Sequence, residues 1–440
     1  MKKLIKILVS KIKFIILIYA LIQLVMILNV ETSYKSDALY YYKLAQECIE
    51  QNEFYPAQQH LYEDYIIAPL YINVLIILLT IYNSTFTISL FNFFIILLQI
   101  TLLYKITQRI FSNFTAKLTI LFFVFYLNTS ALMLQNYTEL FFLLLITASI
   151  YFYLLNKNIY LLLSGICLGG AISVRPLGWA LFCGLVVIQI FTSIRNKKIV
   201  FQHMYIYTGT LIFIILFGGL TFLHFNKFEF TSTTGPVNLL LGANDDATGG
   251  FNSAVLEKGK AGYIEYSDSS TYIQKGEFYQ DQAIRWITDN PLKWLSLAPL
   301  KLFHSFGWDD VSLSFLLGHY DTNFLRVVKI HVTEKDFNIA LPNTSTLGKV
   351  LYYLILFSSH LYYYFLLFAI AGGIYYLFKQ NLHDKTTILI YLFIFFSTLM
   401  IVITVGTPRY KYPMFILLLP FAASYVEMKF GFGKQSIERN

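Results

Sequence analysis

Two carboxylates and three cations of this chain lie where charged side chains are rare, at the edges of long apolar runs. The acids are Asp37 in "YKSDALYYY" and Glu139 in "NYTELFF"; the cations are Arg175 in "SVRPLGW" and Arg409 and Lys411 in "TPRYKYP". Arginine and lysine hold a phosphate through charge-assisted hydrogen bonds. A carboxylate beside that phosphate can take a proton from an attacking hydroxyl. The set therefore suits displacement of a phosphate group by a hydroxyl at a membrane surface.

Each of these residues also has a plainer interpretation. Arg175 and Arg409 can snorkel to lipid headgroups. Glu139 can favour the dipole at a helix N-terminus, and Asp37 can be a first-turn acid of an interfacial helix. The combination is harder to dismiss, because a charge at membrane depth costs about 2.5–3.5 kcal/mol even on the lenient insertion scale and usually faces a functional cavity.

The composition is that of a polytopic membrane protein. The 440 residues are 57% hydrophobic and 18% aromatic, with 13% charged residues and a mean hydropathy of +0.59. Soluble domains carry about 25% charged residues. The net charge of +8 does not indicate nucleic-acid binding, because the basic residues form short clusters between apolar runs, where they set orientation. The three cysteines predict neither a disulfide framework nor a thiolate metal site.

The apolar runs predict an all-α bundle of about ten membrane spans. A basic start places the N-terminus in the cytoplasm, and the C-terminus returns there, as expected for an inner-membrane protein of a bacterium. Residues 66–82 are short and begin near Pro69, so we expect them to re-enter or lie at the interface rather than to span. After the first span, the other spans are expected near residues 84–104, 118–135, 139–155, 159–174, 177–194, 204–224, 350–378, 386–405 and 411–428.

This pattern predicts three regions. Residues 1–224 form an N-terminal transmembrane catalytic module whose first extracytoplasmic loop covers residues 30–65. Residues 225–349 form a large extracytoplasmic loop, and residues 350–440 form the C-terminal transmembrane helices. In this arrangement the two acids and the three cations all meet the outer face, and the cations break the positive-inside pattern there.

At these residues the chain resembles a known family, the membrane glycosyltransferases of the GT-C fold that use polyprenyl-phosphate sugars. The family includes the protein O-mannosyltransferases and the lipid A aminoarabinose transferases. The resemblance is carried, in chain order, by Asp37 with Tyr41, Leu44-Ala45, Pro69 with Tyr71, Glu139, "GICLGGAISVRP", "NLLLGANDDATGGF", "DNPLKWLSLAPLKLFHSFGW" and "RYKYP". The chain has Ser36-Asp37-Ala38 where some subfamilies have paired acids.

The resemblance implies a single inverting displacement. Asp37 would be the general base on the acceptor hydroxyl, and Glu139 would position the acceptor. The phosphate of a polyprenyl-phosphate-sugar donor would be held by Arg175, Arg409 and Lys411. The residues that would position the substrate are Tyr41, Tyr410, Asn244, Lys301 and His304. No cofactor is certain; Asp37 and Glu139 together are compatible with a divalent cation, and support of the loop is the competing interpretation.

Two other classes of function stay open. An O-antigen polymerase or ligase-like enzyme also combines many spans with outer-face arginines, and replacing Asp37 by Asn would leave such an enzyme unaffected. A flippase or transporter of lipid-linked sugars would place its charges at the bilayer midplane on broken helices. The sequence leaves the sugar open, together with the lipid length, the oligomeric state and the acceptor, which can be a glycan, a lipid or a protein.

Overall fold

The computed structural model describes residues 2–432 apart from residues 31, 33, 35, 198–200, 310, 317–344 and 381–383. The regular elements of these described residues are all helices. Because residues 310 and 317–344 are not described, part of the large loop predicted at 225–349 lies outside the described residues. The helices of the bundle are α1 (Lys2–Ser10), α2 (Ile12–Asn29), α5 (Thr85–Ile110), α6 (Asn113–Val124), α7 (Leu127–Met133), α8 (Glu139–Leu155), α9 (Asn158–Val174), α10 (Trp179–Asn196), α11 (Met204–Phe225), α19 (Thr346–Lys379), α20 (Lys385–Ile403) and α21 (Tyr412–Lys429).

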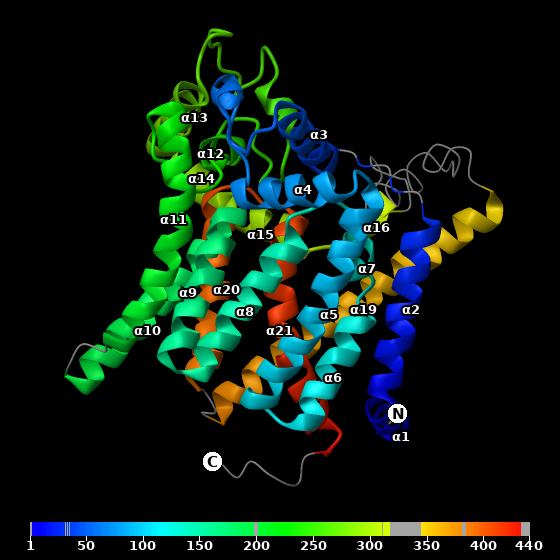
Figure 1. Cartoon of the computed structure of the whole chain (residues 1–440). Helices are drawn as coiled ribbons and strands as arrows, with labels where there is room; N and C mark the ends of the chain where they lie inside the picture. The colour runs from blue at the N-terminus through cyan, green and yellow to red at the C-terminus, as the bar shows by residue number, and fades with distance from the viewer. Residues whose placement is uncertain are drawn as a thin grey trace.

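The remaining helices gather at one end of this bundle (Figure 1). They are α3 (Ser36–Gln51), α4 (Pro69–Ile81), α12 (Gly235–Leu241), α13 (Tyr272–Asp289), α14 (Pro291–Ser296), α15 (Ala298–Phe306) and α16 (Val311–Leu316), with the 3-10 turns η1 (Gln58–Tyr62) and η4 (Ser253–Leu256). Further 3-10 turns are η2 (Pro176–Gly178), η3 (Phe201–His203) and η5 (Pro408–Lys411). The start of α1 and the end of α21 lie at the opposite end (Figure 1), as expected if both termini share one side of the membrane.

Judged by helix length, the structure has fewer helices able to span a membrane than the ten spans predicted from the sequence. Among the described residues, six helices are long and apolar enough to cross a membrane, or seven if one bent pair counts as a span. The expected spans at 139–155 and 159–174 are helices of 17 residues each, α8 and α9, below the roughly 20 residues that a straight crossing requires. The structure therefore shows a multi-helix apolar bundle, and the figure of ten spans is not confirmed.

The span expected at 118–135 is not a single straight helix. It consists of α6 and α7, which are bent by 59° to each other. The break falls just before "NTS", residues 128–130, whose side chains are buried in α7. Buried polar side chains need hydrogen-bond partners, and those of α7 find them in α2, in α21 and at Asp309 of the large loop. Asn128, for example, donates to Asp309 Oδ2 at 2.6 Å.

The second apolar stretch, residues 66–82, forms α4 of 13 residues. Figure 1 shows α4 lying across the end of the bundle rather than along it. Its Pro69 occupies the first helical position, where the missing N–H costs nothing. This orientation agrees with the prediction that residues 66–82 do not form an upright span.

Helices α9 and α11 approach each other through glycines. A Cβ added at Gly165 would lie 2.0 Å from the carbonyl oxygen of Ile206, and one added at Gly209 would lie 2.3 Å from that of Leu162. Gly165 and Gly169 are four residues apart, so they share a face, as in the small-residue motifs of membrane helix pairs. This contact fixes α9, which ends at Val174 just before Arg175.

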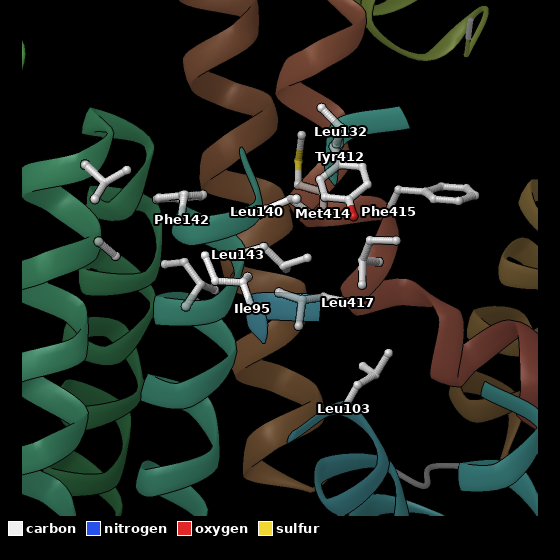
Figure 2. Packing of buried hydrophobic residues seen from close by; sticks show 14 of the residues in the cluster. Ile95, Leu103, Leu132, Leu140, Phe142, Leu143, Tyr412, Met414, Phe415 and Leu417 are labelled. Carbon is white, nitrogen blue, oxygen red and sulfur yellow. The ribbon is translucent and has the colours of Figure 1, made fainter. Parts of the chain in front are cut away.

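The apolar core lies where α5, α8 and α21 meet, below the end that carries the charged residues. Figure 2 shows side chains of these helices interdigitating, together with Leu132 of α7. Leu140 directly follows Glu139, and Tyr412 directly follows Lys411; both are buried. The core therefore fixes the first turns of α8 and α21, and with them the charged residues at their starts. The labelled side chains are Ile95, Leu103, Leu132, Leu140, Phe142, Leu143, Tyr412, Met414, Phe415 and Leu417.

Candidate active site

Four charged residues from four separate segments meet at the end of the bundle where α3 and α4 lie. Asp37 is in the first turn of α3 and Glu139 is the first residue of α8. Arg175 ends α9: as the residue before Pro176 it is restricted to an extended conformation and has φ −149°. Arg409 lies in η5, which begins at Pro408. Helix ends thus aim all four side chains at one point.

The guanidinium of Arg409 joins the two acids. Its Nη1 donates to Asp37 Oδ2 at 2.7 Å, and its Nε donates to Glu139 Oε1 at 2.7 Å. Arg175 Nη1 lies 2.9 Å from the same Glu139 oxygen. The result is a chain of alternating charge, Asp37–Arg409–Glu139–Arg175, which we call the charge chain.

Exposure falls along the charge chain from one end to the middle. The side chain of Asp37 is 50% exposed, that of Arg409 16%, that of Glu139 0% and that of Arg175 14%. Glu139 Oε2 is buried and has no hydrogen-bond partner among the described residues. Asp37 is therefore the carboxylate that a soluble or headgroup-level substrate can reach, and Glu139 holds the arginines in place.

Aromatic rings enclose the two arginines. The Arg409 guanidinium lies 3.9 Å from the ring centre of Tyr137, and that of Arg175 lies 5.3 Å from the ring centre of Tyr410. Such cation–π contacts stabilise a desolvated guanidinium. Although burial works against its charge, the carboxylates of Glu139 and Asp37 hold the pKa of Arg409 well above its usual range. Burial, followed by the nearby charge of Asp37, raises the pKa of Tyr41, which stays a neutral hydroxyl.

The sequence analysis missed a buried link between α3 and α4. Tyr71 Oη donates to Asn136 Oδ1 at 2.8 Å, and Asn136 Nδ2 donates to the carbonyl oxygen of Ala38 at 3.0 Å. Tyr41, one turn after Asp37, packs edge-on against Tyr71 with 6.0 Å between ring centres. This network fixes the first turn of α3 and so the position of Asp37. Tyr71 belongs to a motif noted in the sequence, whereas nothing there indicated its partner Asn136, three residues before Glu139.

Lys411 is not placed as predicted. Its side chain is fully buried and its Nζ lies 3.0 Å from Asp309 Oδ1, donates to the carbonyl oxygen of Trp308 and lies over the ring of Tyr363. An ammonium that is enclosed and paired in this way is not accessible to a phosphate. Lys411 instead fastens the start of α21 to the large loop, so the cationic part of the site is the arginine pair.

Asp309 is the acid that the sequence analysis did not single out. It lines a pocket together with Glu139 and Arg409. The remaining lining residues are Asn128, Leu132, Ser312, Pro408 and Tyr412. The large loop thus contributes a wall of the space beside the arginine pair.

Three residues predicted to position substrate make other contacts in the described part of the chain. Asn244 Nδ2 donates to the carbonyl oxygen of Leu240 at 2.8 Å, and its Oδ1 accepts from the N–H of Asp246, which makes it a turn residue. Lys301 Nζ donates to the carbonyl oxygen of Val402 at 3.0 Å. His304 packs its ring 5.2 Å from that of Trp308. The structure does not bring these three to the charge chain, whereas it does bring Tyr41 and Tyr410 there.

A divalent cation does not fit between Asp37 and Glu139 in this arrangement. The Arg409 guanidinium occupies the space between the two carboxylates and takes one oxygen of each. No group of three or more His, Cys, Asp or Glu side chains suited to a metal ion occurs among the described residues.

No protein-family model matches the chain, and no curated protein matches it. Solved structures of the oligosaccharyltransferase of Archaeoglobus fulgidus do match. The apo form has 11% identity and a TM-score of 0.49 over 96% of this chain and 51% of that chain. The form tethered to an acceptor peptide containing the NVT sequon has 14% identity and a TM-score of 0.47, over 96% and 50%. AglB with an inhibitory peptide and a dolichol-phosphate has 13% identity and a TM-score of 0.47, over 98% and 52%. The chain spans about half the length of these proteins.

Proposed function

We propose that the protein is an integral-membrane glycosyltransferase that moves a sugar from a polyprenyl-phosphate-linked donor to an acceptor hydroxyl, with inversion. The observation that carries the proposal is the charge chain. It combines a half-exposed carboxylate with two enclosed guanidiniums, and all its members lie at helix ends on one end of an apolar bundle. The order of the short sequence motifs supports the same class of enzyme.

Asp37 acts as the general base. Its carboxylate is paired with Arg409 and is exposed enough to meet an acceptor. The acceptor O–H gives its proton to Asp37 while its oxygen bonds to the anomeric carbon. The bond between that carbon and the phosphate oxygen breaks on the opposite face, and the electron pair leaves with the lipid phosphate. One displacement of this kind inverts the anomeric centre.

Arg409 and Arg175 stabilise the departing phosphate. Charge-assisted hydrogen bonds from guanidiniums strengthen as negative charge develops, which is what lowers the barrier. Before substrate binds, both guanidiniums lie beside Glu139 Oε1, so their orientation is already fixed. Glu139 is in this proposal a positioning residue, since its carboxylate is buried under the arginines. Tyr41 and Tyr410 pack around the site and shape it for the sugar.

The donor is proposed to be lipid-linked because the arginine pair lies at the ends of apolar helices. Arg175 directly follows α9, and Arg409 lies between α20 and α21. A phosphate at headgroup level with its hydrocarbon tail in the bilayer would reach such a site directly. A glycan, a lipid or a protein would supply the hydroxyl from the other side. On the proposed orientation, with both termini cytoplasmic, this chemistry takes place on the extracytoplasmic face.

Sugar transfer in membranes tests the proposal. Membranes with the wild type, Asp37→Asn or Asp281→Asn receive a panel of radiolabelled undecaprenyl-phosphate sugars at equal protein level. Asp281 is an exposed acid of α13 and serves as the matched control. We expect transfer by the wild type and the control and a loss of about 10²–10⁴-fold with Asp37→Asn. Full activity of Asp37→Asn would exclude it as the base and favour the polymerase or ligase class. No transfer from any donor would favour the transporter class.

A further inference from the structure

Helix α15 of the large loop has its polarity reversed, and α14 before it exposes two leucines. The four large apolar side chains Leu292, Leu295, Leu300 and Phe303 are 81%, 58%, 46% and 55% exposed. We call these four the α14–α15 apolar face. In α15 the fully buried side chains are instead Lys301 and Ser305. A helix that turns polar groups inward and hydrocarbon outward is suited to an apolar surrounding rather than to water.

The inward-facing polar groups all have partners. Lys301 Nζ donates to the carbonyl oxygens of Val402 and Ile403 at 3.0 and 3.4 Å. Ser305 Oγ accepts from the N–H of Thr407 at 3.2 Å. The two bonds of Lys301 satisfy carbonyls at the end of α20, which are left over wherever a helix stops. The reversed polarity is therefore an ordered arrangement that fastens α15 across the end of α20.

The α14–α15 apolar face continues a stripe on α20. Ile388, Phe395, Leu399 and Ile403 are exposed and follow one another at helical spacing along one side of this candidate span. The stripe ends at Ile403, whose carbonyl oxygen is the one that Lys301 reaches. Phe251, 60% exposed, lies next to the same place, since its N–H donates to the carbonyl oxygen of Gly406. Exposed hydrocarbon is thus present both on the span and on the loop helices, and α15 is hydrogen-bonded to the end of that span.

Polar groups mark the other side of α14. Lys293 is about half exposed and its Nζ lies 2.7 Å from Asp245 Oδ1, also exposed. The Trp286 ring, from α13, lies 5.5 Å from the same ammonium. A charged side that carries a tryptophan, opposite a side of hydrocarbon, is typical of elements that lie in the plane of a membrane surface.

We infer that α14 and α15 are embedded in the membrane surface, with the α14–α15 apolar face among the acyl chains of the leaflet nearest the large loop. The occupant of this face is bilayer hydrocarbon. Embedding also fixes the depth of the charge chain. Ser305 and Lys301 hold the loop 404–411 that carries Arg409, and a Cβ added at Gly406 would lie 2.1 Å from the carbonyl oxygen of Lys301. A membrane-seated α15 therefore keeps Arg409 near headgroup level.

Spin labels on the whole protein in lipid nanodiscs test this inference. Cys48, Cys167 and Cys183 are first replaced by Ala, and single cysteines are then labelled at the four positions of the α14–α15 apolar face. Labels at Phe395 and Leu399 of α20 serve as lipid-facing controls, and labels at Asp281 and Gln282 of α13 as water-facing controls; all four are exposed. Power saturation with oxygen and with a water-soluble nickel chelate reports the surroundings of each label.

We expect oxygen to relax the labels of the α14–α15 apolar face far more than the nickel chelate does, at the ratio found for α20. Nickel accessibility equal to that of Gln282 would show a face in water and overturn the inference. Protection from both reagents would show a protein partner, such as a second copy of the chain, and would overturn it equally. None of these outcomes requires sugar transfer, so the inference stands or fails separately from the proposed function.

Discussion

Asp37 and Arg409 lie 372 positions apart in the chain and meet at 2.7 Å. The contact joins two segments from opposite ends of the chain, since Asp37 follows α1 and α2, and Arg409 directly precedes α21. Arg409 also contacts Glu139, so a single planar guanidinium holds one exposed and one buried carboxylate. The predictions below depend on this bridging geometry or on the packing that supports it.

Replacing Arg409 by Lys should abolish most activity although the charge is kept. An ammonium is a point charge and does not bridge two carboxylates in the fixed fork of a guanidinium. We expect kcat for sugar transfer to fall by about 10²–10³-fold, the loss seen when one donor that stabilises a transition state is removed. Arg285→Lys on the exposed side of α13 is the matched control. Equal rates for the two variants would argue against Arg409 as a phosphate ligand.

Glu139→Gln should lower stability as well as activity. The change removes the buried carboxylate charge that contacts both Arg409 and Arg175. Leaving buried cations without their partner costs about 3–5 kcal/mol. Melting of the purified protein in detergent should show a clear decrease, whereas Glu277→Gln on exposed α13 should melt as the wild type does. Unchanged melting of Glu139→Gln would mean that the arginines are already solvated.

Gly165→Leu should disrupt the contact of α9 with α11. The backbone of Ile206 stands 2.0 Å from where the new Cβ would lie, and a backbone cannot move aside as a flexible side chain does. Overpacking of this kind costs about 1–3 kcal/mol or more. Gly219→Leu on α11 is the control, because nothing lies within 4 Å of its added Cβ. If both variants lost equal amounts of folded protein, the close approach at Gly165 would not be the cause.

Stability should rise with pH above neutrality because of Lys301. Burial lowers the pKa of Lys301 from 10.5 to about 8. Between these values the unfolded chain holds a proton that the folded chain has released, so raising the pH favours the folded state. The melting temperature should therefore rise between pH 8 and 10 more steeply in the wild type than in Lys301→Met. Lys293→Met, at a half-exposed site, should keep the wild-type slope; the same slope in Lys301→Met would assign the effect to another group.

The sequence by itself determined the class of the fold and the members of the charge chain. Long apolar runs with few charges leave the helix as the way to satisfy the backbone in lipid, so the all-α bundle was predictable from composition. Asp37, Glu139, Arg175 and Arg409 were identifiable for the same reason, since a charge beside an apolar run is costly and therefore conspicuous. Pro176 also indicated the end of α9, because the residue before a proline is disfavoured in the helical conformation.

Only the tertiary structure decided which charge pairs with which. Lys411 is two residues from Arg409 and looks equivalent in sequence, but the start of α21 directs it to Asp309 of the large loop and away from the arginines. The break between α6 and α7 and the reversed polarity of α15 depend on partners such as Asp309, Val402 and Thr407. Such contacts join segments far apart in the chain, and local periodicity carries no information about distant partners. This is why the members of the charge chain could be listed from the sequence, whereas their pairing and the position of Asp309 beside them required the fold.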